Sequence, residues 1–250
     1  MPQYINDKHT VNRIGGDANQ GIYEESSTPK HSIGEKLELA DGRCFRYVYT
    51  AAAINPGLLV SQDVSATAIV ESDGKLTAAA ANATEVIYTD SGTVGSATAN
   101  QYQGGYLHIT DDAGEGHQYR IKSNTAADSN AITFTLYDGL VVAVTTDTDV
   151  AVTGSLYYNV VGATAGTDGI IAGVTTCGLT SNYYGWVQTA GVATILADGS
   201  IAIYDNLTLS DGVAGAVQLK DAETEPLVGF ATFAPDSTGH VGVVIQGLVA

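Results

Sequence analysis

One stretch, Ile132-Thr133-Phe134-Thr135-Leu136-Tyr137-Asp138-Gly139, decides the fold of this chain. Its apolar residues Ile132, Phe134 and Leu136 alternate with polar or amphipathic ones, and a period of two places them on one face of a β-strand. The Asp-Gly pair that follows is typical of a tight turn, because glycine adopts the backbone conformations that such turns require. The stretch therefore predicts a half-buried strand that ends in a turn.

The same pattern recurs along most of the chain. Asp-Gly pairs begin at residues 41, 73, 138, 168, 198 and 211, and each is expected to be a turn. Alternating segments between them predict short strands, among them 43–50, 105–110, 117–122, 183–189, 192–197 and 200–204. Strands at this spacing, without a long amphipathic helix, are typical of a sandwich or barrel. The predicted fold is all-β, with a sandwich or barrel body of short antiparallel strands.

Residues 1–34 differ from this body. They are polar and charged, and their scattered apolar residues fit neither a period of 2 nor one of 3.6. We expect an extended N-terminal arm that becomes ordered on a partner, with a disordered leader as the alternative. The apolar side chains of the arm would then be its partner-binding residues: Tyr4, Ile5, Ile14, Ile22 and Tyr23.

The body behind the arm divides at a stretch rich in glycine and threonine that ends near residue 181. This predicts a β-rich domain over 35–180 and a C-terminal β-rich domain over 181–250. The alternative is a single continuous body, because the same stretch can be ordinary strand and loop.

The composition excludes several classes of partner. The 250 residues carry 10 Lys and Arg against 27 Asp and Glu, a net charge of −17. Such a field repels nucleic-acid phosphates and anionic membrane surfaces, so neither is expected as a partner. The N-terminus has no basic start followed by an apolar run, and no segment has the length of a membrane span. We therefore expect a protein made in a cytosol-like compartment.

The chain shows no pattern of catalytic or metal-binding residues. Its five histidines are scattered, and the closest pair, His108 and His117, is expected on neighbouring strands. The acidic turn that holds Asp111, Asp112 and Glu115 does not match a calcium loop, and the two cysteines lack zinc spacing. We expect no catalytic residue, metal or cofactor. A glycan-degrading enzyme stays as a minor hypothesis, because paired carboxylates are assembled in space rather than in sequence.

Four stretches resemble head structural proteins of tailed bacteriophages, and capsid decoration or cement proteins in particular. They are 32–47 with 55–60, 104–107 with 114–124, 184–191 and 228–248, and their motifs include Gly114-Glu115-Gly116-His117-Gln118-Tyr119 and Tyr184-Gly185-Trp186-Val187-Gln188. The resemblance implies a non-enzymatic β-rich virion protein, a homo-oligomer that is often a trimer. It would bind the major capsid protein on the outer capsid surface after assembly in the bacterial host cytoplasm. The alternative is a phage tail or fibre component, or a receptor-binding module, which would have the same strand-rich sequence pattern.

Overall fold

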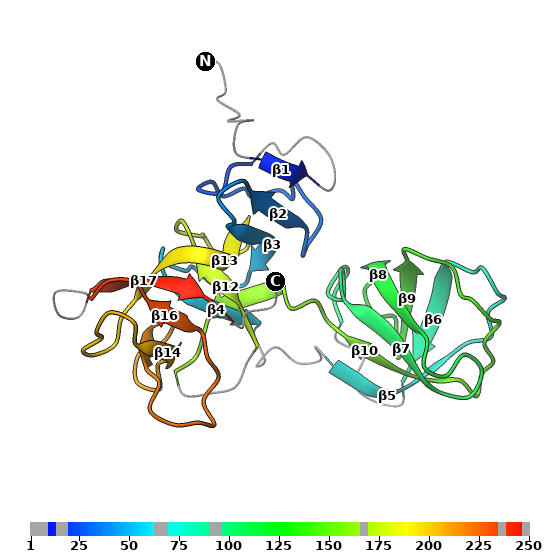
Figure 1. Cartoon of the computed structure of the whole chain (residues 1–250). Helices are drawn as coiled ribbons and strands as arrows, with labels where there is room; N and C mark the ends of the chain where they lie inside the picture. Colours follow the sequence, from blue (N-terminus) through cyan, green and yellow to red (C-terminus); the bar gives the residue numbers. More distant parts are fainter. Residues whose placement is uncertain are drawn as a thin grey trace, which may run out of the picture. The chain divides into compact units, whose positions relative to one another are not determined.

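A computed structural model describes residues 10–13, 20–62, 70–90, 97–165, 170–234 and 239–246. The described residues form strands and turns and no helix, which confirms the all-β prediction. No described segment is a helix with the length and hydropathy needed to cross a membrane. The chain folds as two compact units (Figure 1): unit 1 holds Met1–Asp63 and Asn159–Ala250, and unit 2 holds Val64–Tyr158.

Unit 2 is a closed antiparallel barrel. Its strand order is β10-β5-β6-β9-β8-β7, and the last strand pairs with the first. The strands are β5 (Val70–Leu76), β6 (Glu85–Thr89), β7 (Tyr106–Asp111), β8 (Gln118–Asn124), β9 (Ala131–Leu136) and β10 (Asp149–Thr153). In β9 the apolar residues Ile132, Phe134 and Leu136 are buried and their neighbours are not, as the alternation predicted.

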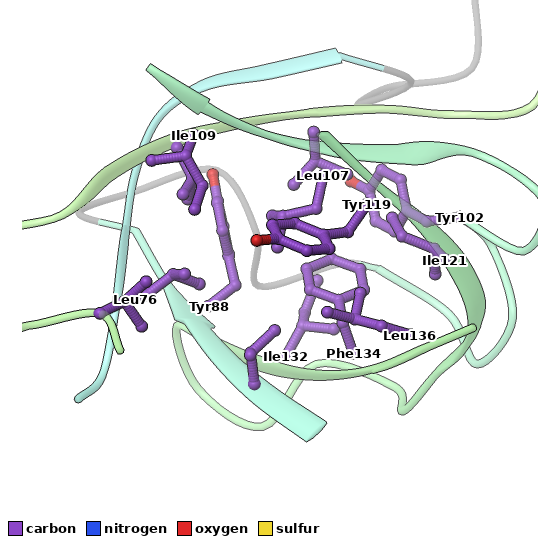
Figure 2. Packing of buried hydrophobic residues seen from close by; sticks show 14 of the residues in the cluster. Leu76, Tyr88, Tyr102, Leu107, Ile109, Tyr119, Ile121, Ile132, Phe134 and Leu136 are labelled. Carbon is purple, nitrogen blue, oxygen red and sulfur yellow. The ribbon is translucent and has the colours of Figure 1, made fainter. Parts of the chain in front are cut away.

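Aromatic rings pack among aliphatic side chains in the interior of this barrel. Figure 2 shows the ring of Phe134 among Tyr88, Tyr102 and aliphatic side chains. Phe134 meets Tyr88 and Tyr102 edge to face, with ring centroids 5.9 Å and 5.6 Å apart. Such contacts add to the free energy gained by removing the rings from water.

Unit 1 is built on a ring of five strands. The pairs β3–β11, β11–β4, β4–β12 and β12–β13 are closed by a further pairing of β13 with β3. These strands are β3 (Cys44–Thr50), β4 (Leu59–Gln62), β11 (Tyr158–Gly162), β12 (Ile171–Thr175) and β13 (Tyr184–Leu196). Strand β2 (Lys36–Leu39) pairs with β3, and β1 (Thr10–Arg13) pairs with β2.

The long strand β13 belongs to this ring and to a second sheet. Its first half pairs with β3, and its second half pairs with β17 (His240–Ile245). The sheet continues through β16 (Gly229–Ala231) and β14 (Asn206–Leu209) to β15 (Val217–Leu219). The buried face of this sheet forms a hydrophobic cluster that includes Ile195, Leu207 and Val243.

Glycine makes the change of direction in β13 possible. Gly191 has a φ of +85°, and a Cβ there would lie 2.9 Å from Cγ of Arg43. The side-chain nitrogen of Gln188 donates to the carbonyls of Ala190 and Val192, which satisfies backbone groups beside the bend. The sequence predicted two strands separated at Gly191, and the structure has one bent strand instead.

The domain boundaries also differ from the division that the sequence suggested. Residue 180 lies between β12 and β13, which are neighbours in the ring of unit 1. Unit 2 is instead inserted between β4 and β11, which are paired through Gln62 and Val160. Pairing between residues distant in sequence, such as Tyr49 with Tyr184, joins the segments before and after unit 2 into one unit.

Two further local predictions were wrong. The Asp73-Gly74 pair lies within β5 rather than in a turn, because Gly74 is paired with Val150 of β10. Residues 200–204 are not a strand: a turn closes between Ala202 and Asp205, and β14 begins only at Asn206.

Candidate interaction surface

The second half of the predicted arm is packed on unit 1. Gln20 is 4% exposed, and its side-chain amide makes hydrogen bonds through both its nitrogen and its oxygen. Its Nε2 donates to the carbonyls of Glu24 and Tyr184, and its Oε1 accepts a 2.6 Å hydrogen bond from the hydroxyl of Tyr47. The indole nitrogen of Trp186 donates to the backbone carbonyl of Gln20. These bonds fix the chain at residue 20 on strands β3 and β13.

An aromatic cluster holds the segment that follows. The side chain of His31 is 4% exposed, and its ring lies 5.0 Å from that of Tyr47 and 4.8 Å from that of Trp186. Its Nδ1 lies 3.0 Å from Oε1 of Glu35. Ile33 is 3% exposed, so the segment also contributes an apolar side chain to the core.

Burial raises the pKa values of two tyrosines in this cluster. Removal from water raises the pKa of Tyr47 to about 12, although a hydrogen bond from the backbone nitrogen of Lys30 acts in the opposite direction. Burial also raises the pKa of Tyr184, with a smaller effect from Tyr49. Both phenols are therefore neutral near pH 7, and Tyr47 can donate to Gln20.

The structure places two of the five predicted contact residues. Tyr4, Ile5 and Ile14 lie outside the described residues. Ile22 is half-buried, and its carbonyl accepts a hydrogen bond from Thr176 Oγ1. Tyr23 is 64% exposed. The role of these residues in binding a partner stays a prediction.

Tyr23 stands at the rim of a surface hollow in unit 1. The hollow has a volume of about 240 Å³, and Arg43, Val192, Thr194 and His240 also line it. The guanidinium of Arg43 donates to Asp41 at 2.7 Å and to the hydroxyl of Tyr23 at 3.5 Å. Burial lowers the pKa of Arg43, but the hydrogen bonds to Asp41 and Tyr23 more than offset this effect and leave it raised. The hollow is thus lined by an exposed aromatic ring beside the Arg43–Asp41 ion pair.

The residues considered for chemistry lie in separate environments. His108 Nε2 contacts Thr153 Oγ1 at 3.0 Å, whereas His117 Nδ1 contacts the hydroxyl of Tyr119 at 3.2 Å. In the acidic turn, Asp112 accepts a hydrogen bond from Thr145. Across the part of the chain that the structure describes, no three His, Cys, Asp or Glu residues form a group able to hold a metal.

Sequence reasoning missed the residues that anchor the segment. Gln20 follows Gly15-Gly16-Asp17-Ala18-Asn19 and has the composition of a loop, so nothing local signals its burial. His31 likewise stands among polar residues. The signal that was present is Trp186, because a single tryptophan in a strand needs a partner for its indole nitrogen when it is buried.

Searches of protein-family models, of curated proteins and of solved structures find no match to this chain.

Proposed function

We propose that this chain is a non-enzymatic structural protein of a tailed-phage particle. It binds the outside of the capsid and cements neighbouring major capsid proteins. In this proposal it is a homo-oligomer, a trimer by the family resemblance, and it joins the virion after synthesis in the host cytoplasm. The phage-head resemblance of its sequence supports the assignment.

The structural observation that carries the proposal is the anchoring of residues 20–34 on unit 1. A protein that bridges subunits needs contact residues held at fixed points on a rigid body, because ordering a loose segment on binding costs conformational entropy. Gln20, His31 and Ile33 are buried, and Tyr23 between them is exposed beside Arg43. This segment therefore presents an exposed aromatic side chain on an anchored stretch of backbone, and tyrosine is a residue type enriched at protein interfaces.

The charge of the chain supports a protein partner. A net charge of −17 favours association with a basic protein surface and opposes binding to nucleic acid. Acidic charge also keeps neighbouring copies from associating nonspecifically in solution.

Binding of chain variants to capsid shells tests the proposal. The shells are those of the encoding phage, purified without this chain, and bound protein is measured by co-sedimentation. Deletion of residues 2–9 together with Tyr23→Ser is expected to reduce binding at least tenfold. The deletion stops before β1, because removal through residue 30 would also remove the buried Gln20 and expose the Tyr47 cluster.

The matched control is Ile170→Ser, which removes another exposed apolar side chain of unit 1. It should bind as the unchanged chain does. Binding of the double variant at the unchanged level would overturn the role of the arm, and failure of the unchanged chain to bind shells would overturn the capsid assignment. Copy number then separates the alternatives: hundreds per particle for a capsid protein, and a handful for a tail or fibre protein.

A further inference from the structure

An unusual tyrosine lies at one end of the second sheet of unit 1. Tyr204 is 84% exposed and has a φ of +73°. Bulky side chains rarely adopt this left-handed conformation, which glycine and asparagine tolerate best. An exposed side chain gains little from burial, so stability does not explain a tyrosine at this position.

The turn that carries Tyr204 is held by hydrogen bonds at both of its ends. The backbone nitrogen of Ala202 donates to Oδ2 of Asp205 at 2.7 Å, and the nitrogen of Asp205 donates back to the carbonyl of Ala202. The nitrogen of Tyr204 donates to the carbonyl of Ala231, whose own nitrogen donates to the carbonyl of Asp205. The backbone under Tyr204 is therefore fixed before any partner binds.

Two other exposed apolar side chains belong to this turn or to the segment that follows its backbone partner Ala231. Ile203 precedes Tyr204 and is 49% exposed. Phe233 is 47% exposed and follows Ala231, the residue to which the turn is bonded. The ring of Phe233 lies over Gly242 of β17. A Cβ on Gly242 would lie 2.5 Å from Cε1 of Phe233, so the ring fits only because this residue is glycine. We call Ile203, Tyr204 and Phe233 the tyrosine tip.

Carboxylates flank the tyrosine tip. Asp205 belongs to the turn itself, and the backbone nitrogen of Lys220 donates to the carbonyl of Asn206, which brings the loop 220–225 beside it. That loop carries exposed Asp221 and Glu223, and its one cation, Lys220, has its ammonium bonded to the carbonyl of Ala222. The segments joined to the apolar tip, which we call its rim, therefore carry more carboxylates than cations.

We infer that the tyrosine tip is a docking surface for another protein, one that offers an apolar pocket rimmed by lysine or arginine. Rigid aromatic residues at the centre of a contact, surrounded by polar residues, are the usual composition of an interface hot spot. The acidic rim complements a basic one and guides the approach of the partner. This surface is additional to the arm and to Tyr23, and it gives unit 1 a second point of attachment.

A second copy of this chain is a poorer occupant. Two copies that met through their tips would bring two acidic rims together, so the homo-oligomer of the proposed function must form through another surface. A basic protein partner meets no such repulsion.

Two variants separate binding from folding. Tyr204→Gly removes the ring and relieves the left-handed conformation, so its melting temperature should equal or exceed that of the unchanged chain. Asp221→Lys reverses one rim charge at an exposed position. The control is Val213→Ser, which removes an exposed apolar side chain at the opposite end of the β14–β15 hairpin.

The first measurement is co-sedimentation with the capsid shells. We expect Tyr204→Gly to bind at least tenfold more weakly, Asp221→Lys to bind more weakly at low salt, and Val213→Ser to bind normally. Normal binding by Tyr204→Gly overturns this inference and leaves the proposed function intact.

The second measurement does not depend on the capsid assignment. The photo-cross-linking amino acid p-benzoylphenylalanine replaces Tyr204 or, as the control, Val213, and cross-linking is carried out in the cells that assemble the natural complex. A product with a different protein, specific to position 204 and mapped to a peptide that contains lysine or arginine, supports the inference. A product with a second copy of the chain, or none above the control, overturns it.

Discussion

The hydroxyl of Tyr47 donates a 2.6 Å hydrogen bond to Oε1 of Gln20, across the boundary between the N-terminal segment and strand β3. Tyr47 is fully buried, so its hydroxyl depends on protein groups for its hydrogen bonds. The backbone nitrogen of Lys30 also donates to this hydroxyl, at 3.1 Å. One phenol thus joins the two ends of the segment 20–30.

Gln20→Leu should lower the free energy of unfolding of unit 1 by about 1–3 kcal/mol, because it leaves the Tyr47 hydroxyl without its acceptor in a buried site. Urea denaturation followed by the fluorescence of Trp186, the only tryptophan of the chain, reports on unit 1 alone. Combining Gln20→Leu with Tyr47→Phe should recover part of the loss, because both partners are then apolar. A loss within error for Gln20→Leu would contradict the anchoring role.

Alkaline pH should destabilise unit 1 through Tyr47. Its folded pKa is about 12, above the ordinary value of 10.0, so the folded state holds this proton more tightly than the unfolded state. The resulting stability is fully present below pH 10 and is lost as the pH rises through 12, with a total of about 2–3 kcal/mol. The difference in unfolding free energy between the unchanged chain and Tyr47→Phe, measured from pH 8 to pH 12, should show this dependence. Parallel pH curves for the two proteins would refute it.

Gly74→Ala should destabilise the barrel of unit 2. A Cβ at this position of β5 would lie 1.8 Å from Cε2 of Tyr88, whose ring is fully buried and cannot move away freely. We expect a loss of about 1–3 kcal/mol, typical of overpacking in a core. Hydrogen exchange of peptides from β5 and β6 measures this loss, while Trp186 fluorescence should show unit 1 unchanged. Gly162→Ala in β11 of unit 1 is the control, because nothing lies within 4 Å of a Cβ there. Its effect is measured by Trp186 fluorescence and should be smaller; equal losses for the two variants would contradict the steric explanation.

Cys177 should react slowly with iodoacetamide at pH 8. Burial raises the pKa of its thiol, and the charges of Glu25 and Glu24 raise it further, so the reactive thiolate is scarce. Glu25 also accepts two hydrogen bonds from Thr180, which holds the segment against the loop that contains Cys177. Glu25→Gln should therefore increase the rate of alkylation modestly. Gln20→Leu should increase the rate more, because it removes side-chain hydrogen bonds that hold the segment 20–25 on β3 and β13. Alkylation at the rate of a free cysteine in the unchanged chain would be inconsistent with this geometry.

The parts of the fold that depend on local sequence were predictable. The alternation at 132–136 identified β9 because one barrel face is buried and the other is not. The pairing of β3 with β13 was not predictable, because strands that far apart in sequence carry no local mark of their partner. For the same reason, the sequence contains no local sign that unit 2 is inserted between β4 and β11.

The turn at the tyrosine tip shows a second reason why a prediction from the sequence was wrong. Ile201, Ile203 and the intervening alanine have the alternation of a strand, and Ile201 is indeed buried. The carboxylate of Asp205 bonds to the nitrogen of Ala202 and closes a turn instead. Side-chain bonds to the backbone can override a hydrophobic pattern of only a few residues.

The pairing of Gln62 with Val160 has an evolutionary consequence. It holds the two points where the chain leaves and rejoins unit 1 on adjacent strands, as the ends of an ordinary hairpin loop are held. A few residues between β4 and β11 would close unit 1 without any change to its ring of strands. A single genetic insertion or deletion can therefore add, exchange or remove unit 2, and a chain without it can keep the rest of unit 1, with Tyr23 and the tyrosine tip, unchanged.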